Sequence, residues 1–331
     1  MSSYRIIGSE LSPYSVKVRS YFRYKGLPHE WIPRSPAVQA EFQKYAKLPL
    51  VPLVVTPEGE GVQDSTPIIE RFEAMRDEPS IVPDDAALAF VSALLEEYGD
   101  EWGNKWMFHY RWRYQPDAWS TAERIAQQMM GAQGTLAVAQ ARAAVAERMM
   151  GRLSFVGSND RTQPTIEASF KRALSLLEAH LQARPFMLGG RPAMADFGLW
   201  GQFYEAATDP TPGAIMRASS PKVMAWVQRM VSPKAEGPFE PWSALAPTLL
   251  PLLKEEVAAF FLPWSAANAA AIAREDKSFE MTLGDASWSQ EPQKYHARSL
   301  AEIRRKYAAA KSAAGLEAIL KDSGCLKYLS A

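Results

Sequence analysis

Short apolar runs alternate with segments of helical periodicity over the first 80 residues. Tyr4 to Ile7, closed by Gly8, predicts a strand. Apolar positions between Pro13 and Gly26 then recur at helical spacing, with proline suited to the first turn and glycine to the end. The same patterns predict further strands at 29–33, 53–56 and 62–63, a short helix at 39–45 and a helix from Ser65. The predicted order is βαβαββα.

From Asp84 onward the pattern changes to long helical segments rich in alanine, methionine and aromatic residues, at roughly 85–112, 120–151, 165–183 and 194–207. Beyond Pro238 we expect a helical stretch to Arg274, then a hairpin with strands 279–283 and 286–290 around Gly284-Asp285, and two late helices. Ser299 to Glu302 matches a capping box for the first late helix. Three parts follow: an α/β domain at 1–80, an all-α domain at 84–240 and an α/β extension at 241–331.

Composition removes several classes of function. The 331 residues contain 37 acidic and 37 basic side chains, a balance that disfavours nucleic acid as a partner. The one cysteine, Cys325, excludes an intramolecular disulfide, a thiolate zinc site and a dithiol redox pair. The four histidines show no ligand spacing, so no metal is expected.

The most apolar stretch, 245–264, is interrupted by prolines and by three consecutive charged residues, which a membrane span would not tolerate. We therefore expect no membrane association. The start of the sequence lacks the basic head and apolar core of a secretory signal, so the expected location is the cytoplasm.

Three short motifs occur in the order and spacing of the first domain of a glutathione transferase: the loop Ser9-Glu-Leu-Ser-Pro-Tyr-Ser15, the pair Val51-Pro52 and the pair Asp64-Ser65. On these motifs and the βαβαββα order, the chain resembles the glutathione S-transferase superfamily. The motifs lie within 1–80, the helical pattern extends the resemblance through the second part, and the extension matches less well. The resemblance implies a thioredoxin-like N-terminal domain, an all-α C-terminal domain, glutathione as co-substrate and a homodimer.

In that superfamily a serine, cysteine or tyrosine after the first strand contacts the glutathione sulfur, and Ser12 is the best match, ahead of Ser9 and Ser15. Independently of the resemblance, the helix that follows Ser12 presents free N–H groups and a positive dipole end, which favour a thiolate. Lowering a thiol pKa by about two units from ~8.5 raises the ionised fraction over tenfold at neutral pH. Ser12 before Pro13 is equally a good helix N-cap, and this structural alternative stays open.

The resemblance also assigns the tripeptide contacts. Val51-Pro52 resembles the cis-proline turn whose preceding backbone pairs with the cysteinyl unit; the alternative is a proline that merely enters a strand. Ser65 would take the γ-glutamyl carboxylate and Asp64 its amine, unless Ser65 only caps its helix. For the glycine carboxylate the family usually supplies a polar residue where this chain has Leu50. Lys47, Lys44 and Gln43 are possible substitutes, and Lys47 is the nearest.

The segment from Trp102 to Trp112 concentrates aromatic residues on the helix that would face the sulfur. Trp106, His109 and Tyr110, together with Tyr14, are candidate walls of an apolar acceptor pocket; helical aromatics that form core are the alternative.

Ala193-Met-Ala-Asp196 resembles the family's helix-start box with its hydroxyl lost, and we interpret it as structural. Trp288, Lys294, Tyr295 and Arg298 are candidates to bring the missing glycine-carboxylate contact if the extension is a lid.

The leading hypothesis is a transferase that adds glutathione thiolate to a small apolar electrophile, with Ser12 stabilising the thiolate. No cysteine lies near position 12, so the superfamily's thiol-transfer chemistry is disfavoured. The second hypothesis is a non-catalytic binding or scaffold protein that reuses the fold. The departures at Leu50 and Ala193 and the long extension favour this second hypothesis slightly.

Overall fold

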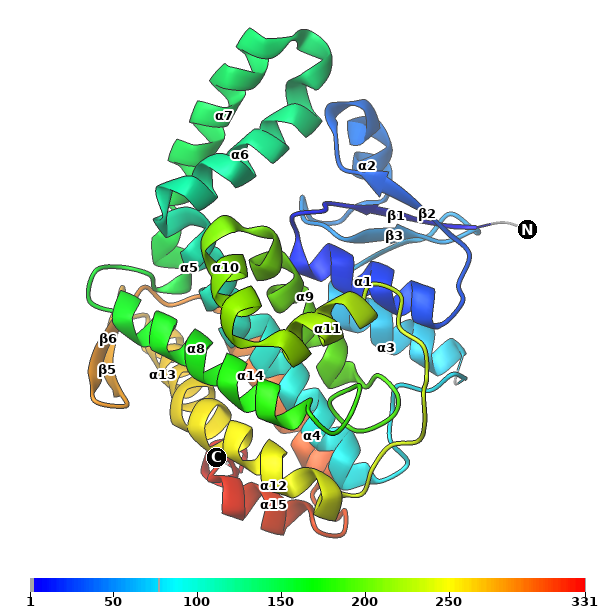
Figure 1. Ribbon diagram of the computed structural model, residues 1–331, viewed down its shortest axis with the longest axis vertical. Helices are drawn as coiled ribbons and strands as arrows, with labels where there is room; N and C mark the ends of the chain where they lie inside the picture. The colour runs from blue at the N-terminus through cyan, green and yellow to red at the C-terminus, as the bar shows by residue number, and fades with distance from the viewer. Residues whose placement is uncertain (1–2, 77, 331) are drawn as a thin grey trace.

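A four-stranded sheet in the order β2-β1-β3-β4 organises the N-terminal part of the chain. The computed structural model describes residues 3–76 and 78–330 (Figure 1). The strands are β1 (Tyr4–Gly8), β2 (His29–Pro33), β3 (Leu53–Val55) and β4 (Gly61–Gln63). β1 and β2 are parallel, and the β1–β3 and β3–β4 pairs are antiparallel. The predicted βαβαββα order is confirmed.

Alternation along the strands assigns each face of the sheet to different helices. The helices here are α1 (Pro13–Tyr24), α2 (Gln39–Tyr45) and α3 (Ser65–Met75), with a short 3₁₀ turn, η1 (Pro36–Val38), before α2. Ile6 and Val54 point to the face covered by α1 and α3 and join the main core. Ile7 and Leu53 point to the other face and pack on Phe42 of α2. Figure 1 shows α2 on the opposite side of the sheet from α1 and α3.

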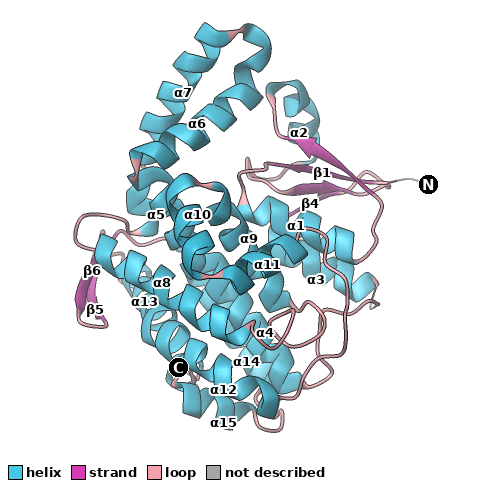
Figure 2. Cartoon of the chain, in the orientation of Figure 1, coloured by secondary structure: helices cyan, strands magenta, loops and turns pink. Residues whose placement is uncertain are grey.

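The second part of the chain is entirely helical. It contains α4 (Ala86–Glu97), η2 (Tyr98–Gly103), α5 (Asn104–Arg113), α6 (Gln115–Met130), η3 (Gly131–Gln133), α7 (Thr135–Met150), η4 (Leu153–Val156), α8 (Gln163–His180), α9 (Met194–Thr208), α10 (Pro210–Ser219) and α11 (Pro221–Arg229). The helical turns of α4, η2 and α5 run on without a break. Helices dominate the view in Figure 2.

The segment expected as helical from 120 to 151 is two helices, because the chain turns back between them. Gly134 has φ +93°, a conformation that suits glycine and ends the helical path. The resulting α6–α7 hairpin projects from the helical body on the same side as α2 (Figure 1). α10 and α11 were not predicted; each opens with a proline in its first turn, the position where proline costs no hydrogen bond.

The extension packs into the same core as the rest of the chain. It comprises α12 (Trp242–Leu252), η5 (Leu253–Phe261), α13 (Leu262–Ala273), β5 (Phe279–Leu283), β6 (Ala286–Gln290), α14 (Lys294–Ala310), α15 (Leu316–Ser323) and α16 (Leu326–Leu329). The hairpin β5–β6 has the predicted strand limits. Trp264, Leu300 and Leu320 are buried members of one apolar cluster that also holds Ile6 of the sheet. The extension is therefore continuous with the body in its packing.

The capping box predicted at Ser299 to Glu302 is wrong. α14 begins at Lys294, so Ser299 lies inside the helix. Its hydroxyl donates to the carboxylate of Glu97 on α4 instead of capping its own helix. The role of Ser299 depends on a contact with a helix about 200 positions earlier in the chain. A local sequence pattern cannot report such a contact.

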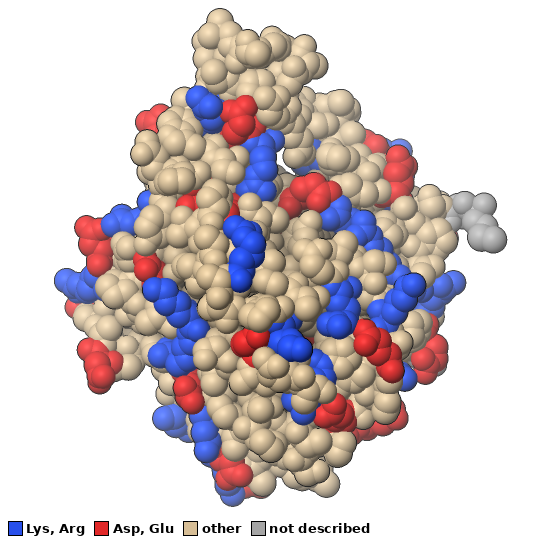
Figure 3. All heavy atoms as spheres, viewed as in Figure 1, with Lys and Arg blue, Asp and Glu red and all other residues tan. Residues whose placement is uncertain are grey.

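The distribution of charge on the surface and the polarity of the helices are both consistent with the balanced composition of the chain. On the face shown in Figure 3, basic and acidic side chains are interspersed. Within the described residues, no helix combines the length and apolar character needed to cross a membrane.

Candidate functional site

Three segments singled out by the sequence meet at one edge of the sheet. Ile7 of β1 lies opposite Leu53 of β3, and Leu53 lies opposite Gln63 of β4. The end of β1, the start of β3 and the end of β4 are therefore neighbours. The loop that leads to Ser12, the Val51-Pro52 pair and the Asp64-Ser65 pair begin or end at this edge, which makes it the candidate site.

Ser12 is the N-cap of α1. Its Oγ accepts the backbone N–H of Ser15 at 3.3 Å. The cap predicted as an alternative is therefore present, but a hydroxyl that accepts one bond keeps its own proton for another acceptor. The loop is attached to the helical part through Arg111, whose guanidinium donates to the carbonyl of Leu11 at 2.9 Å and is itself held by Asp209 at 2.6 Å.

The loop before β3 is held by the side-chain amide of Gln63, which bonds to backbone groups between Lys47 and Leu50. The Val51–Pro52 peptide bond is cis, as the resemblance implies. Lys47 is exposed, and its backbone N–H, not its ammonium, makes the contact with Gln63. Its proposed role toward the glycine carboxylate stays a prediction.

Asp64 is turned away from the helix that it precedes. It occupies the N-cap position of α3 with φ +76°, and its side chain accepts no hydrogen bond from that helix. An aspartate in this place usually caps the helix. Here the carboxylate faces Tyr295 of α14, whose hydroxyl lies 3.3 Å from each of its oxygens. Ser65, the first residue of α3, is buried.

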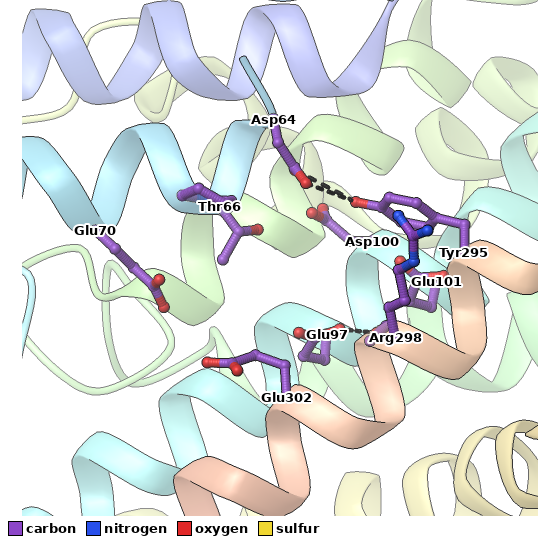
Figure 4. Close-up of a pocket in the computed structure, with 11 residues that line it drawn as sticks. Asp64, Thr66, Glu70, Glu97, Asp100, Glu101, Tyr295, Arg298 and Glu302 are labelled. Carbon is purple, nitrogen blue, oxygen red and sulfur yellow. Dashed lines mark hydrogen bonds between the residues drawn. The ribbon is translucent and has the colours of Figure 1, made fainter. Parts of the chain in front are cut away.

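A cavity of about 380 Å³ opens beside Asp64, between α3, the α4–η2 segment and the first turns of α14 (Figure 4). Most of its polar wall is acidic. The lining residues are Asp64, Thr66, Pro67, Glu70, Glu97, Asp100, Glu101, Tyr295, Arg298, Ser299 and Glu302. Because α14 forms one wall, the extension is part of the site.

Buried cations and burial itself offset much of this negative charge. Lys17, fully buried, forms ion pairs with Glu96 and with Asp100, the latter at 2.6 Å. Burial raises the pKa of Asp100 to about 7, against the opposing pull of Lys17. Burial, together with the charge of Glu96, raises the pKa of Glu97 to about 8. Burial therefore favours the protonated form of both carboxyls, while the ion pair with Lys17 favours the charged form of Asp100.

Two family models match the sequence. The glutathione S-transferase N-terminal domain matches residues 6–80, and the glutathione S-transferase C-terminal domain matches residues 132–229. Together they span more than half of the 331 residues.

The chain belongs to the glutathione S-transferase superfamily.

The chain is similar, at low identity, to several solved glutathione S-transferase structures. A glutathione S-transferase of Methylobacterium radiotolerans, in complex with glutathione sulfonate, is 18% identical, with a TM-score of 0.42 over 72% of this chain and 96% of that one. A Tau class glutathione S-transferase from mango is 16% identical, with a TM-score of 0.43 over 74% and 96%. One from Rhodospirillum rubrum is 15% identical, with a TM-score of 0.45 over 73% and 98%. The comparison with curated proteins finds no match.

In this member of the superfamily, the expected aromatic walls of an acceptor pocket are core residues. Trp106, His109 and Tyr110 are at most 1% exposed. Trp106 donates to Ser169 at 2.9 Å, and the ring of His109 bonds to Ser158 at 2.7 Å. The helix is covered on all sides by other elements, so even a long run of aromatics is absorbed by packing. Their assignment as pocket walls is corrected accordingly.

Tyr14 is hydrogen-bonded to a residue that lines the cavity, Asp100. It is half-buried, and its hydroxyl donates to the main-chain carbonyl of Asp100 at 3.0 Å. Burial raises the pKa of Tyr14, so its phenol stays protonated at neutral pH. Its side chain joins α1 to the helix segment that lines the cavity.

Two of the four residues named as candidates for a lid line the cavity. Tyr295 and Arg298 do reach the site, at the Asp64 side and not at the loop that carries Lys47. Trp288 is buried, where its indole packs beside that of Trp102. Lys294 is exposed and does not line the cavity. No local pattern marks Gln63, Glu97 or Asp100 as site residues, because only the packing of distant elements gives them a role.

Asp196 and Cys325 are both buried. The Asp196 carboxylate accepts backbone N–H groups of Met187 and Ala193 and the indole N–H of Trp226, all at 2.9 Å, so it is structural. Cys325 is fully buried, and burial raises the pKa of its thiol to about 12. Within the described residues, no group of three or more His, Cys, Asp or Glu side chains is arranged to hold a metal ion.

Proposed function

We propose that the chain is a glutathione-dependent transferase that adds the glutathione thiolate to a small apolar electrophile. The observation that carries the proposal is the meeting of Ser12, Val51-Pro52 and Asp64-Ser65 at one edge of the sheet, through the register of Ile7, Leu53 and Gln63. Membership of the superfamily supports glutathione as the ligand.

Ser12 acts on the sulfur in this proposal. Its oxygen is occupied by the N–H of Ser15, which leaves its proton to donate to a thiolate. The start of α1 adds a partial positive charge that favours the same anion. Because the one cysteine of the chain is buried with a raised pKa, the reacting thiol comes from the ligand.

Asp64 and Ser65 hold the γ-glutamyl unit. Since the Asp64 carboxylate does not cap α3, it has lone pairs available for an ammonium group. The α3 N-terminus and the Ser65 hydroxyl suit a carboxylate. The backbone of Val51, next to Pro52, pairs with the cysteinyl unit, and Lys47 serves the glycine carboxylate. Tyr14 is the remaining wall that we assign to the electrophile.

Calorimetric titration of glutathione into the wild-type protein and Ser65→Ala tests the binding site. Saturable binding that weakens in the variant, and not in the exposed control Ser312→Ala, supports the proposal. Turnover is then measured with a panel of electrophiles. Absence of glutathione binding at millimolar ligand, in a protein shown to be folded by circular dichroism, contradicts it.

A non-catalytic binding or scaffold role is the second candidate. Leu48 and Leu50, 56% and 61% exposed, stand where a glycine carboxylate would need polar partners. Exposed apolar side chains at such a place fit contact with another protein better than contact with an anion. A folded chain that binds no glutathione favours this role.

A homodimer in the cytoplasm, with a part in detoxification, completes the proposal. The superfamily resemblance supports the dimer, and light scattering of the purified chain tests it. A monomer at micromolar concentration contradicts that part alone.

A further inference from the structure

α14 is attached to the body along its whole length. His296 and Ser299 make hydrogen bonds to Glu101 and Glu97, and Lys306 pairs with Glu70 of α3 at 2.6 Å. Leu300 and Ile303 are buried beneath the helix. The first turn of α14 is therefore held in place at the mouth of the cavity next to Asp64, as Figure 4 shows.

Tyr295 in this first turn contacts the Asp64 carboxylate. One hydroxyl proton is shared between two oxygens at 3.3 Å each, longer than the usual O–H···O distance of about 2.7–2.8 Å. A carboxylate offers about four acceptor positions. The Tyr295 contact therefore leaves the Asp64 carboxylate, which lines the cavity, with positions free to accept an ammonium group.

Arg298 lies one turn further along and lines the same cavity. Among the residues that line it, six carry carboxyl groups and Arg298 is the one cation. The ion pairs of the described chain include none to Arg298, whose side chain is exposed. A ligand carboxylate that enters next to so many acidic groups needs a cation to meet it.

We propose that the first turn of α14 completes the γ-glutamyl subsite. Tyr295 is a positioning residue that aims Asp64 at the ligand's ammonium group, and Arg298 binds the adjacent α-carboxylate. The subsite is therefore selective for thiols with an amino-acid zwitterion at this end. The inference rests on the proposed glutathione site, but it assigns to the extension a role that neither domain model covers.

Titration calorimetry with three ligands tests the two roles separately. The probes are glutathione, its analogue without the α-amino group and its analogue without the α-carboxylate. Tyr295→Phe is expected to raise the Kd for glutathione and for the decarboxylated analogue about fivefold, the effect of one lost hydrogen bond. It is expected to leave the desamino analogue unchanged. In an Asp64→Asn background, Tyr295→Phe adds nothing.

Arg298→Gln is expected to raise the Kd about tenfold for glutathione and for the desamino analogue, and to leave the decarboxylated analogue unchanged. Tyr307→Phe, which removes a hydroxyl from the same helix away from the cavity, is the control. Because Tyr295 and Arg298 are both exposed, their variants are expected to fold.

Tighter binding of glutathione by Tyr295→Phe would show that Tyr295 competes with the ligand, and it would overturn the inference. Equal weakening of all three ligands in either variant, or no change, would overturn it as well. If glutathione binds to the wild type, fails to bind to Ser65→Ala and binds unchanged to both α14 variants, the role of α14 is overturned and the proposed function stands. Failure of the wild type to bind glutathione overturns the proposed function and this inference together.

Discussion

The side-chain amide of Gln63 is bonded to both backbone groups of Leu48. Its Oε1 accepts the Leu48 N–H at 2.9 Å, and its Nε2 donates to the Leu48 carbonyl at 2.8 Å. The same amide also accepts from Lys47 and donates to Leu50. A single side chain at the end of β4 therefore fixes the loop that leads into Val51-Pro52.

Gln63→Glu tests this contact. Glutamate keeps the acceptor but cannot donate to the carbonyls of Leu48 and Leu50, so the loop loses half of its bonds. We expect the glutathione Kd to rise about tenfold, with a free energy of unfolding within about 1 kcal/mol of wild type. Calorimetry and urea denaturation measure the two quantities. The same exchange at the exposed Gln140 of α7 is the control, and an unchanged Kd in Gln63→Glu would count against a role for the loop.

Ser12→Ala distinguishes the role of Ser12 as N-cap of α1 from its proposed role in stabilising the thiolate. Loss of the cap costs about 1 kcal/mol of stability. Loss of the donor to the thiolate is expected to lower kcat about a hundredfold, while the glutathione Kd changes less than about threefold, since the thiolate is a small part of the tripeptide. Steady-state kinetics with an electrophile panel gives the answer. Ser9→Ala is the control, and full turnover in Ser12→Ala would show that another group stabilises the sulfur.

Local patterns predicted much of the fold. The hairpin β5–β6 follows from alternation on both sides of Gly284-Asp285, and Gly284 has the positive φ, +59°, that such a turn needs. The meeting of Ser12 with Asp64-Ser65 needed the resemblance as well, because register between strands is set by packing that the sequence does not display. The bond from Tyr295 to Asp64 joins residues 231 positions apart, and no local signal reports it.

The function of the aromatic residues on α5 could not be predicted from the sequence. Trp106 and Tyr110 have the composition of a ligand pocket, but whether an aromatic residue lines a pocket or fills the core depends on which helices lie beyond it. Here α8 and α9 supply Phe170 and Phe203, which pack against these rings. Only the arrangement of the neighbouring helices decides between the two.

Asp196→Ala is expected to cost about 3–5 kcal/mol of stability. The change leaves three buried N–H donors without an acceptor, those of Met187, Ala193 and Trp226. Asp196→Asn keeps one acceptor and is expected to cost less. Urea denaturation measures both, with the exposed Asp322→Ala as control. A loss below about 1 kcal/mol in Asp196→Ala would mean that the donors find other partners.

His180 is expected to weaken the fold in acid. Its ring is buried, with Nε2 donating to the Met187 carbonyl and Nδ1 next to Thr248, both at 2.8 Å. Burial lowers the pKa of His180 from 6.5 to about 4. Since the folded state disfavours the charged ring, its stability contribution is present above pH 6.5 and is lost as the pH falls toward 4, by about 3 kcal/mol in total.

The measurement is the difference in unfolding free energy between wild type and His180→Gln from pH 7 to pH 4. Glutamine can also donate to Met187 and does not titrate, so the variant is expected to lose less stability over this interval. Other titrating groups contribute equally to both proteins and cancel in the difference. Parallel curves would show that His180 is not protonated on unfolding in this range.

The burial of Cys325 shields the one thiol of the chain from the electrophiles of the proposed reaction. An electrophile that alkylates thiols meets only the ligand's sulfur in the folded state, because the Cys325 side chain is buried within the extension and burial raises the pKa of its thiol. The catalyst is then not consumed by the compounds it processes. Any alkylation that does occur must follow a local opening of the last helices, so its rate measures how often that end of the chain comes apart.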